Sequence, residues 1–196
     1  ILYSLFSLFI FSSIYFFLNK DYYQNTTVQK IENQEALPGG HFKLIKQDGT
    51  VFDSEISNKL MLIYFGFTHC PDVCPTTLIK MSDVIDRLGD DALKVNSIFI
   101  SVDPERDNVE TINDYVSAFH NQIIGLTGNE EQISNVAKDW GVYYQKEFID
   151  SSAEYTVNHL DIIFLANANG EFIDFFPPKI QSALIVEKVR NLIKSD

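Results

Sequence analysis

The stretch LMLIYFGFTHCPDVCP, residues 60–75, joins an apolar run to a short segment with two cysteines. The run Leu60–Phe67 is too short for a good helix and rich in residues that favour strands, so it predicts a buried central strand. Cys70 and Cys74 each precede a proline, whose ring disfavours helical geometry in the residue before it. The sequence therefore predicts a stiff loop after the strand. Pro75 suits the first turn of the following helix, which places Cys74 at the helix cap.

This position predicts reactive sulfur atoms. Unpaired amide groups and the positive end of a helix favour a thiolate, and they lower the pKa of a cysteine placed there. We therefore expect the pKa of Cys74 to be lowered. We also expect Cys70 and Cys74 to lie near the protein surface.

Further patterns predict strands that alternate with helices. Asp48-Gly49 and Asn169-Gly170 each lie between two short apolar runs, which is the signal for a tight hairpin. A second buried strand is expected over residues 95–102, and another over 160–165. Helices are expected from Pro75 to Gly89, after a cap at Asp107 or Asn108, from Asn129 to Gly141, and over residues 181–193. This order predicts a layered α/β domain with a mixed central sheet.

The N-terminal segment Ile1–Leu18 has no charge, proline or glycine and predicts one transmembrane helix. A span needs roughly 20 apolar residues, and because the sequence starts with Ile we expect residues upstream to contribute. A cleaved signal peptide is the alternative, but no small-residue cleavage site precedes Lys20. Residues 19–40 are polar and end in Pro-Gly-Gly, which is typical of a tether. The predicted organisation is an anchor over 1–18, a tether over 19–40 and a domain over 41–196.

Composition excludes several classes of protein. The chain has 15 basic and 27 acidic residues, a net charge of −12, and no basic stripe, so nucleic acid is not an expected partner. Two cysteines are too few for a disulfide scaffold, and 45% apolar residues are too many for a disordered chain.

Three kinds of chemistry use a pair of cysteines like this one. A redox disulfide is compatible with the C-x-x-x-C spacing, although the thiol-exchange signature is C-x-x-C. A structural zinc site is disfavoured, because it needs a second pair of ligands at short spacing. A Cu(I) site needs two soft thiolates and accepts an imidazole as a third ligand.

A copper site therefore needs one of the four histidines. His41 opens a hairpin and His120 ends a helix, so a structural role explains both. The side chain of His69 is expected to point away from the adjacent Cys70. His159 precedes the strand predicted over residues 160–165 and lies beside a loop, which makes it the favoured candidate.

Several segments together resemble the SCO/SenC family of copper chaperones for cytochrome c oxidase assembly. They are FGFTHCPDVCPTTL (65–78), FISVDPERD (99–107), VNHLDIIFLANANGEFIDFF (157–176) and GGHFKLIKQDG (39–49). The resemblance implies a thioredoxin-like fold in which Cys70, Cys74 and His159 bind copper. It also makes Asp103 a candidate for a group that supports the metal ligands, and Asp107 a candidate helix cap.

The resemblance implies a chaperone rather than an enzyme. Cu(I), or Cu(II) as the second oxidation state, would pass by ligand exchange to the binuclear copper site of cytochrome c oxidase subunit II. A Cys70–Cys74 disulfide would remove both thiolates and release the metal, so a thiol reductant of thioredoxin type is an expected partner.

A second function stays open, because the same cysteines suit a membrane-anchored thiol-disulfide oxidoreductase that reduces cysteines of the oxidase subunit. A peroxidase of the peroxiredoxin type is disfavoured, since both cysteines lie in one short loop. The expected location is the bacterial inner membrane with the domain in the periplasm, because no Arg-rich presequence is visible. The alternative is the mitochondrial inner membrane, facing the intermembrane space.

Overall fold

The structure is a computed structural model that describes residues 38–149 and 154–195. Strands and helices alternate through the first two thirds of the domain, as the sequence predicts. The elements are β1 (Lys43–Lys46), β2 (Val51–Asp53), α2 (Ser54–Ser57), β3 (Leu60–Gly66), α3 (Val73–Leu88), the 3-10 helix η1 (Gly89–Lys94), β4 (Val95–Ser101), α4 (Val109–Ser117), β5 (Ile123–Thr127), α5 (Glu130–Asp139), β6 (Tyr144–Phe148), β7 (Tyr155–His159), β8 (Ile163–Ala166), β9 (Phe172–Phe176) and α6 (Ser182–Ser195).

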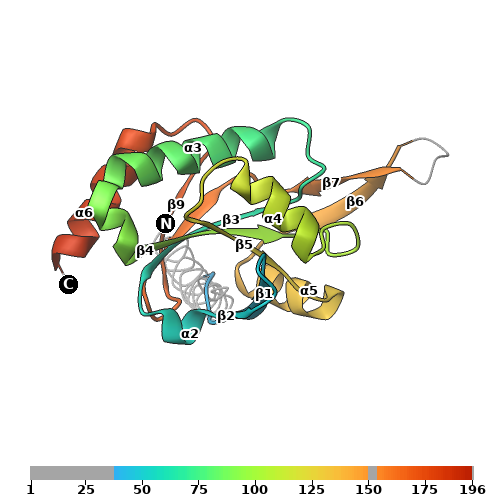
Figure 1. Cartoon of the computed structure of the whole chain (residues 1–196), viewed down its shortest axis with the longest axis horizontal. Helices are drawn as coiled ribbons and strands as arrows, with labels where there is room; N and C mark the ends of the chain where they lie inside the picture. Colours follow the sequence, from blue (N-terminus) through green and yellow to red (C-terminus); the bar gives the residue numbers. More distant parts are fainter. Residues whose placement is uncertain (1–37, 150–153, 196) are drawn as a thin grey trace, which may run out of the picture. The chain divides into compact units, whose positions relative to one another are not determined.

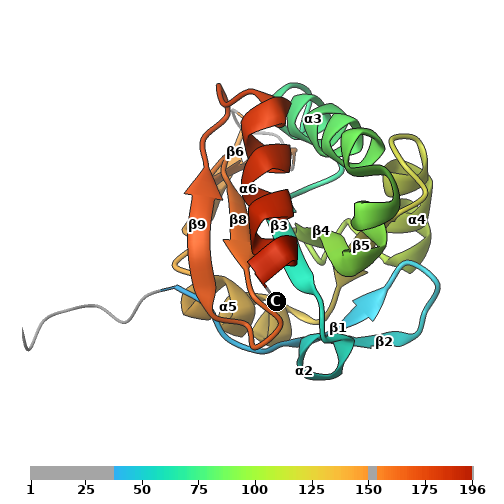
Figure 2. The ribbon, with the colours of Figure 1, turned by 90° about the vertical axis from the view of Figure 1, so that its left-hand side faces the viewer.

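A seven-stranded sheet organises the domain, in the order β2-β1-β5-β4-β3-β8-β9. The central strands β3, β4 and β5 are parallel, whereas β1, β8 and β9 pair with their neighbours antiparallel. Helices α3, α4 and α6 cover one face and α5 lies on the other (Figure 1). Figure 2 shows α6 beside α3 on that first face. The expected α/β architecture with a mixed sheet is therefore confirmed.

Both predicted hairpins form. Strands β1 and β2 pair through Ile45 and Val51, and Gly49 in the turn has a φ of +81°. Strands β8 and β9 pair on either side of Gly170, which has a φ of +74°. A left-handed conformation of this kind favours glycine, which explains the Asp-Gly and Asn-Gly signals.

The helices form where expected, with two corrections at their first residues. Helix α3 begins at Val73 with Asp72 at its N-cap, so Cys74 lies inside the first turn rather than at the cap. The side chain of Asn108, not that of Asp107, caps α4 by accepting a hydrogen bond from the Thr111 amide. The cap assigned to Asp107 was therefore wrong. Asn129 caps α5 as predicted.

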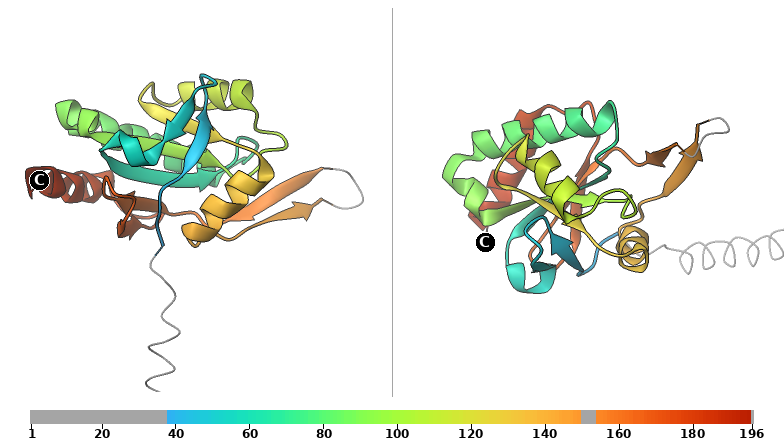
Figure 3. Two further views of the ribbon diagram at one scale, coloured as in Figure 1. Left: turned by 90° about the horizontal axis from the view of Figure 1, so that it is seen from below. Right: turned by 45° about the vertical axis from the view of Figure 1, so that its right-hand side comes forward.

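A two-stranded hairpin, β6–β7, forms a separate sheet. It extends away from the seven-stranded sheet in both views of Figure 3. The strand expected over residues 160–165 is wrong at its start, because β8 begins only at Ile163. His159 instead ends β7.

The described chain starts at Pro38, three residues before the predicted start of the domain. The Gly39 amide donates to the Asp139 carbonyl at 2.9 Å, and the Gly40 amide donates to the Gly170 carbonyl at 2.8 Å. These two glycines therefore belong to the domain rather than to a tether. The predicted anchor over 1–18 and most of the tether lie outside the described residues. Among the residues described, no helix is long and apolar enough to cross a membrane.

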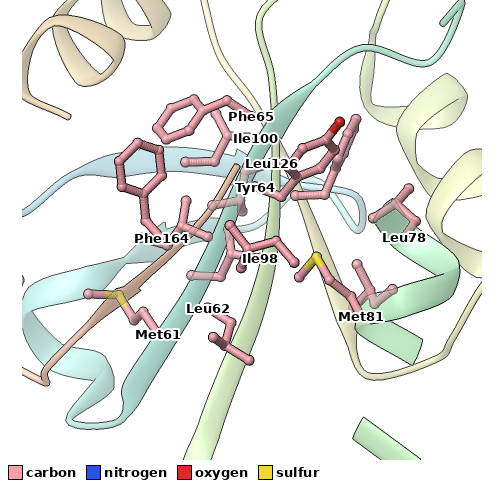
Figure 4. Close-up of a cluster of buried hydrophobic side chains, with 14 of the residues drawn as sticks. Met61, Leu62, Tyr64, Phe65, Leu78, Met81, Ile98, Ile100, Leu126 and Phe164 are labelled. Carbon is pink, nitrogen blue, oxygen red and sulfur yellow. The ribbon is translucent and has the colours of Figure 1, made fainter. Parts of the chain in front are cut away.

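The core lies on both faces of β3 and β4, in which every residue is buried. Strands covered on both faces read as continuous apolar runs, which is the pattern seen in the sequence. Figure 4 shows how residues of five elements meet here: Met61, Leu62, Tyr64 and Phe65 of β3, Ile98 and Ile100 of β4, Leu78 and Met81 of α3, Leu126 of β5 and Phe164 of β8.

Candidate metal centre

Two segments that are far apart in the sequence come together here: one carries Cys70 and Cys74, and the other carries His159, 85 positions after Cys74. Cys70 lies in the loop between β3 and α3, Cys74 lies in the first turn of α3, and His159 ends β7. Their Sγ and imidazole nitrogen atoms all lie within 4.8 Å of one another. Cys74 Sγ lies 3.3 Å from His159 Nε2.

The two cysteines are free thiols held in one compact turn. The Cys74 amide lies 3.5 Å from Cys70 Sγ, and the Cys70 amide donates to the Phe67 carbonyl at 3.3 Å. Contrary to the sequence expectation, both side chains are buried; Cys70 is 8% exposed and Cys74 is 0% exposed.

Burial also reverses the expected shift of the Cys74 pKa. Removal from water disfavours the charged thiolate and raises the pKa of Cys74 to about 12, although the Tyr64 hydroxyl opposes this effect. The helix end is present as predicted, but desolvation is the larger effect. Without a metal, Cys74 is therefore a neutral thiol at pH 7.

A glycine in the apolar run, Gly66, makes room for the Cys74 sulfur. A Cβ atom on Gly66 would lie 2.9 Å from Cys74 Sγ and 2.9 Å from the Phe99 ring. Tyr64 and Gly66 are two residues apart on β3 and so share the face of the sheet that α3 covers. A glycine inside an otherwise apolar run is the feature of the sequence that could have indicated this close approach.

The imidazole of His159 is half-buried between aromatic rings. Phe67 and Tyr64 contact it edge-on, with ring centroids 5.7 Å and 6.1 Å from the imidazole centroid. Burial lowers the pKa of His159, which favours the neutral form that binds metals. Nδ1 lies 3.3 Å from the Leu160 carbonyl. With the proton on Nδ1 donated to that carbonyl, the Nε2 lone pair faces Cys74.

A tyrosine hydroxyl lies close to the sulfur of Cys74. Burial raises the pKa of Tyr64, and the nearby Cys74 and Asp161 raise it further, so the residue is a neutral phenol. Asp161 in turn accepts a hydrogen bond from Thr77 Oγ1 at 3.0 Å. Neither Tyr64 nor Asp161 stood out in the sequence, because each lies within a strand or loop of ordinary composition.

The donor set suits copper. The three donor atoms lie within 4.8 Å of one another, close enough to share one ion, since metal–sulfur and metal–nitrogen bonds are about 2.0–2.3 Å long. Two thiolates and one imidazole are soft and borderline ligands, the combination that Cu(I) prefers.

The other residues considered from the sequence lie elsewhere. His41, His69 and His120 are not part of the cluster; Nδ1 of His69 instead lies 3.1 Å from Thr68 Oγ1. Asp103 is fully buried and accepts hydrogen bonds from Arg106 and Tyr155 rather than from a cysteine or His159.

Comparisons with known proteins agree with this site. Protein SCO1 homolog 1, mitochondrial, of Arabidopsis thaliana is 42% identical over 144 residues, which cover 72% of this chain and 43% of that protein. The SCO2-like protein of Rickettsia felis is 41% identical over 140 residues, covering 70% of this chain and 68% of that protein. The match thus spans less than half of the plant protein's length.

Solved structures are similar in fold. Copper-bound ScoI of Arabidopsis thaliana superposes with a TM-score of 0.73 at 39% identity, covering 81% of this chain and 99% of that chain. Copper-bound ScoI of Bradyrhizobium japonicum superposes with a TM-score of 0.73 at 39% identity, covering 79% of this chain and 98% of that chain. BsSco superposes with a TM-score of 0.60 at 20% identity, covering 82% of this chain and 96% of that chain. At this identity the likeness shows the fold alone. The thioredoxin-like fold is therefore confirmed. The SCO1/SenC family model matches residues 30–194, and the chain belongs to this family.

Proposed function

We propose that this chain binds one copper ion through Cys70, Cys74 and His159 and delivers it to the binuclear copper site of cytochrome c oxidase subunit II. The observation that carries the proposal is the cluster of two thiols and one imidazole within 4.8 Å. Relatives of the same fold are solved with copper bound. The chain belongs to the SCO1/SenC family, and its resemblance to copper chaperones for cytochrome c oxidase assembly supports the oxidase as the destination.

The residues of the site explain how copper can be held and then released. Because Cys74 is a neutral thiol without metal, uptake of Cu(I) displaces its proton, and affinity therefore rises with pH. The imidazole is half-buried at the end of a strand, so an incoming ligand from a partner can approach the ion from the His159 side. Ligand exchange then transfers copper without release into water.

Oxidation provides a second control. Joining the two thiols as a disulfide, with loss of two electrons and two protons to an oxidant, removes both sulfur donors. The working cycle therefore includes a thiol reductant of thioredoxin type. We place the domain outside the cytoplasm, anchored by residues 1–18 in the bacterial inner membrane or, alternatively, in the mitochondrial inner membrane facing the intermembrane space.

The test is an anaerobic competition titration of the reduced chain with Cu(I). One ion per chain is expected for the native protein, with weak binding after Cys70→Ser/Cys74→Ser or His159→Ala. His120→Ala is the matched control, because His120 is outside the cluster and contacts Asp86. In cells, the His159→Ala chain should leave oxidase subunit II without copper. Tight binding by the double cysteine variant would refute the proposal.

Thiol-disulfide exchange is a second candidate function, favoured by two free sulfur atoms in one turn. A dithiol reductase does not need His159, whereas a copper site does. We expect His159→Ala to abolish copper binding and oxidase assembly while disulfide exchange continues. If that variant still assembled the oxidase, the reductase would be the better account.

A further inference from the structure

The strand that ends in His159 is not part of the seven-stranded sheet. Among the strands that the structure describes, it pairs only with β6, in a sheet of two strands. Such a hairpin is marginally stable by itself. Contacts outside the hairpin must therefore determine where the imidazole lies relative to the two thiols.

One face of β7 makes these contacts. Side chains two residues apart on a strand share a face, so Tyr155, Val157 and His159 point the same way. Val157 is buried in the core, Tyr155 is half-buried, and His159 reaches the cysteines. Whatever holds Tyr155 also sets the rotation of the strand, and hence the direction of the imidazole.

Arg106 holds Tyr155. The guanidinium lies 3.7 Å from the centroid of the Tyr155 ring, and its Nη1 donates to the Tyr155 carbonyl at 2.9 Å. Arg106 Nε also donates to Asp103 Oδ2 at 2.5 Å, while the Tyr155 hydroxyl donates to Asp103 Oδ1 at 2.8 Å. The arginine and the tyrosine thus share a single carboxylate, which is fully buried.

The same short segment also holds the cysteine loop. Asp107 accepts hydrogen bonds from the Thr68 amide at 2.9 Å and from Thr68 Oγ1 at 2.6 Å, two residues before Cys70. The Asp107 amide donates to the Asp103 carbonyl at 2.9 Å, which ties the two aspartates together. Residues 101–107 therefore contact both segments that hold the candidate ligands, strand β7 and the cysteine loop.

We propose that Arg106, oriented by Asp103, is a positioning residue that sets the distance between the His159 imidazole and the two thiols. The inference rests on the proposed function only in treating that imidazole as a copper ligand. A lysine retains the charge but lacks the planar group that stacks on Tyr155 while donating in two directions. Lysine should therefore not replace it.

The test compares Arg106→Lys with the native full chain, using Arg87→Lys as the matched control. Arg87 is exposed and pairs with Asp83 along α3. The first measurement, on the apo protein, is the nuclear Overhauser contact between the rings of His159 and Phe67, whose centroids lie 5.7 Å apart. The second is Cu(I) affinity. Arg106→Lys should lose the ring contact and bind copper about tenfold more weakly or worse, whereas Arg87→Lys should match the native chain.

Tyr155→Phe is the second variant, for the case that Arg106→Lys does not fold. It keeps the ring under the guanidinium and removes only the hydroxyl, which donates to Asp103 at 2.8 Å and to Glu105 at 3.5 Å. A smaller loss in the same two measurements is expected. If the ring contact persists in the variants, or is lost without weaker copper binding, the inference is overturned. If the native chain binds no copper, the proposed function fails, but the ring contact in the apo variants still decides whether Arg106 positions His159.

Discussion

At the scale of the residue, Cys74 shows two opposing influences on one thiol. The start of α3 favours a thiolate, and this is the influence that a sequence reveals. Complete burial favours the neutral thiol, and it depends on neighbours from β3 and β7 that are distant in sequence. Burial has the larger effect, so the motif predicted the position of Cys74 but gave the wrong direction for its pKa.

We predict slow alkylation of Cys74 in the folded apo protein. The Cys70→Ser variant leaves Cys74 as the single thiol, and iodoacetamide reacts with the thiolate. A pKa raised from 9.0 to about 12 lowers the thiolate fraction at pH 8, so the folded rate should be at least a hundredfold below the rate in guanidinium. The rate should rise as the pH approaches 12. Equal rates in the folded and unfolded chain would contradict the burial of this thiol.

The candidate third ligand was harder to predict. Position in the sequence favoured His159 among four histidines, but only the family resemblance selected it. The structure places His159 at the end of β7, a strand with a mostly half-exposed pattern. Its approach to Cys74 depends on Arg106 and Tyr155, which lie 49 positions apart, and no local pattern reports such a contact.

At the scale of the element, the turn signals were reliable because their causes are local. Asp48-Gly49 and Asn169-Gly170 predicted the hairpins β1–β2 and β8–β9, whose glycines have positive φ. The β6–β7 hairpin was missed because it has no continuous apolar run and no tight-turn dipeptide. Its residues have the composition of a loop. The contacts that hold it, of Tyr155 with Asp103 and Arg106 and of Val157 with the core, are distant in sequence.

The close approach of β3 and α3 gives a prediction at this scale. Gly66→Ala places a methyl group 2.9 Å from Cys74 Sγ and from the Phe99 ring, so one of them must shift. We expect a loss of about 1–3 kcal/mol in the free energy of unfolding, measured in urea, together with weaker Cu(I) binding.

Gly125→Ala is the matched control for that variant. Its methyl group would lie 2.4 Å from Ile112 on α4, and Gly125 is on β5, outside the metal cluster. It should lose stability and keep its copper affinity. Equal copper affinities in the two variants would show that the space at Gly66 does not matter to the site.

At the scale of the whole molecule, the parallel strands explain why two motifs meet. Parallel strands end at the same edge of a sheet, and ligands bind there. The cysteine loop follows β3 and residues 102–108 follow β4, its parallel neighbour, so both segments lie at one edge. This proximity follows from the order of strands and helices. The position of β7 at the same edge does not follow from that order, because the β6–β7 hairpin lies outside the seven-stranded sheet.

In the proposed function, two thiolates and one imidazole hold a single copper ion. X-ray absorption spectroscopy of the reduced, Cu(I)-loaded full chain measures this donor set most directly. We expect one copper per chain with two sulfur neighbours and one nitrogen neighbour, and loss of the nitrogen in His159→Ala. A site with only sulfur neighbours, or a spectrum unchanged by His159→Ala, would contradict it.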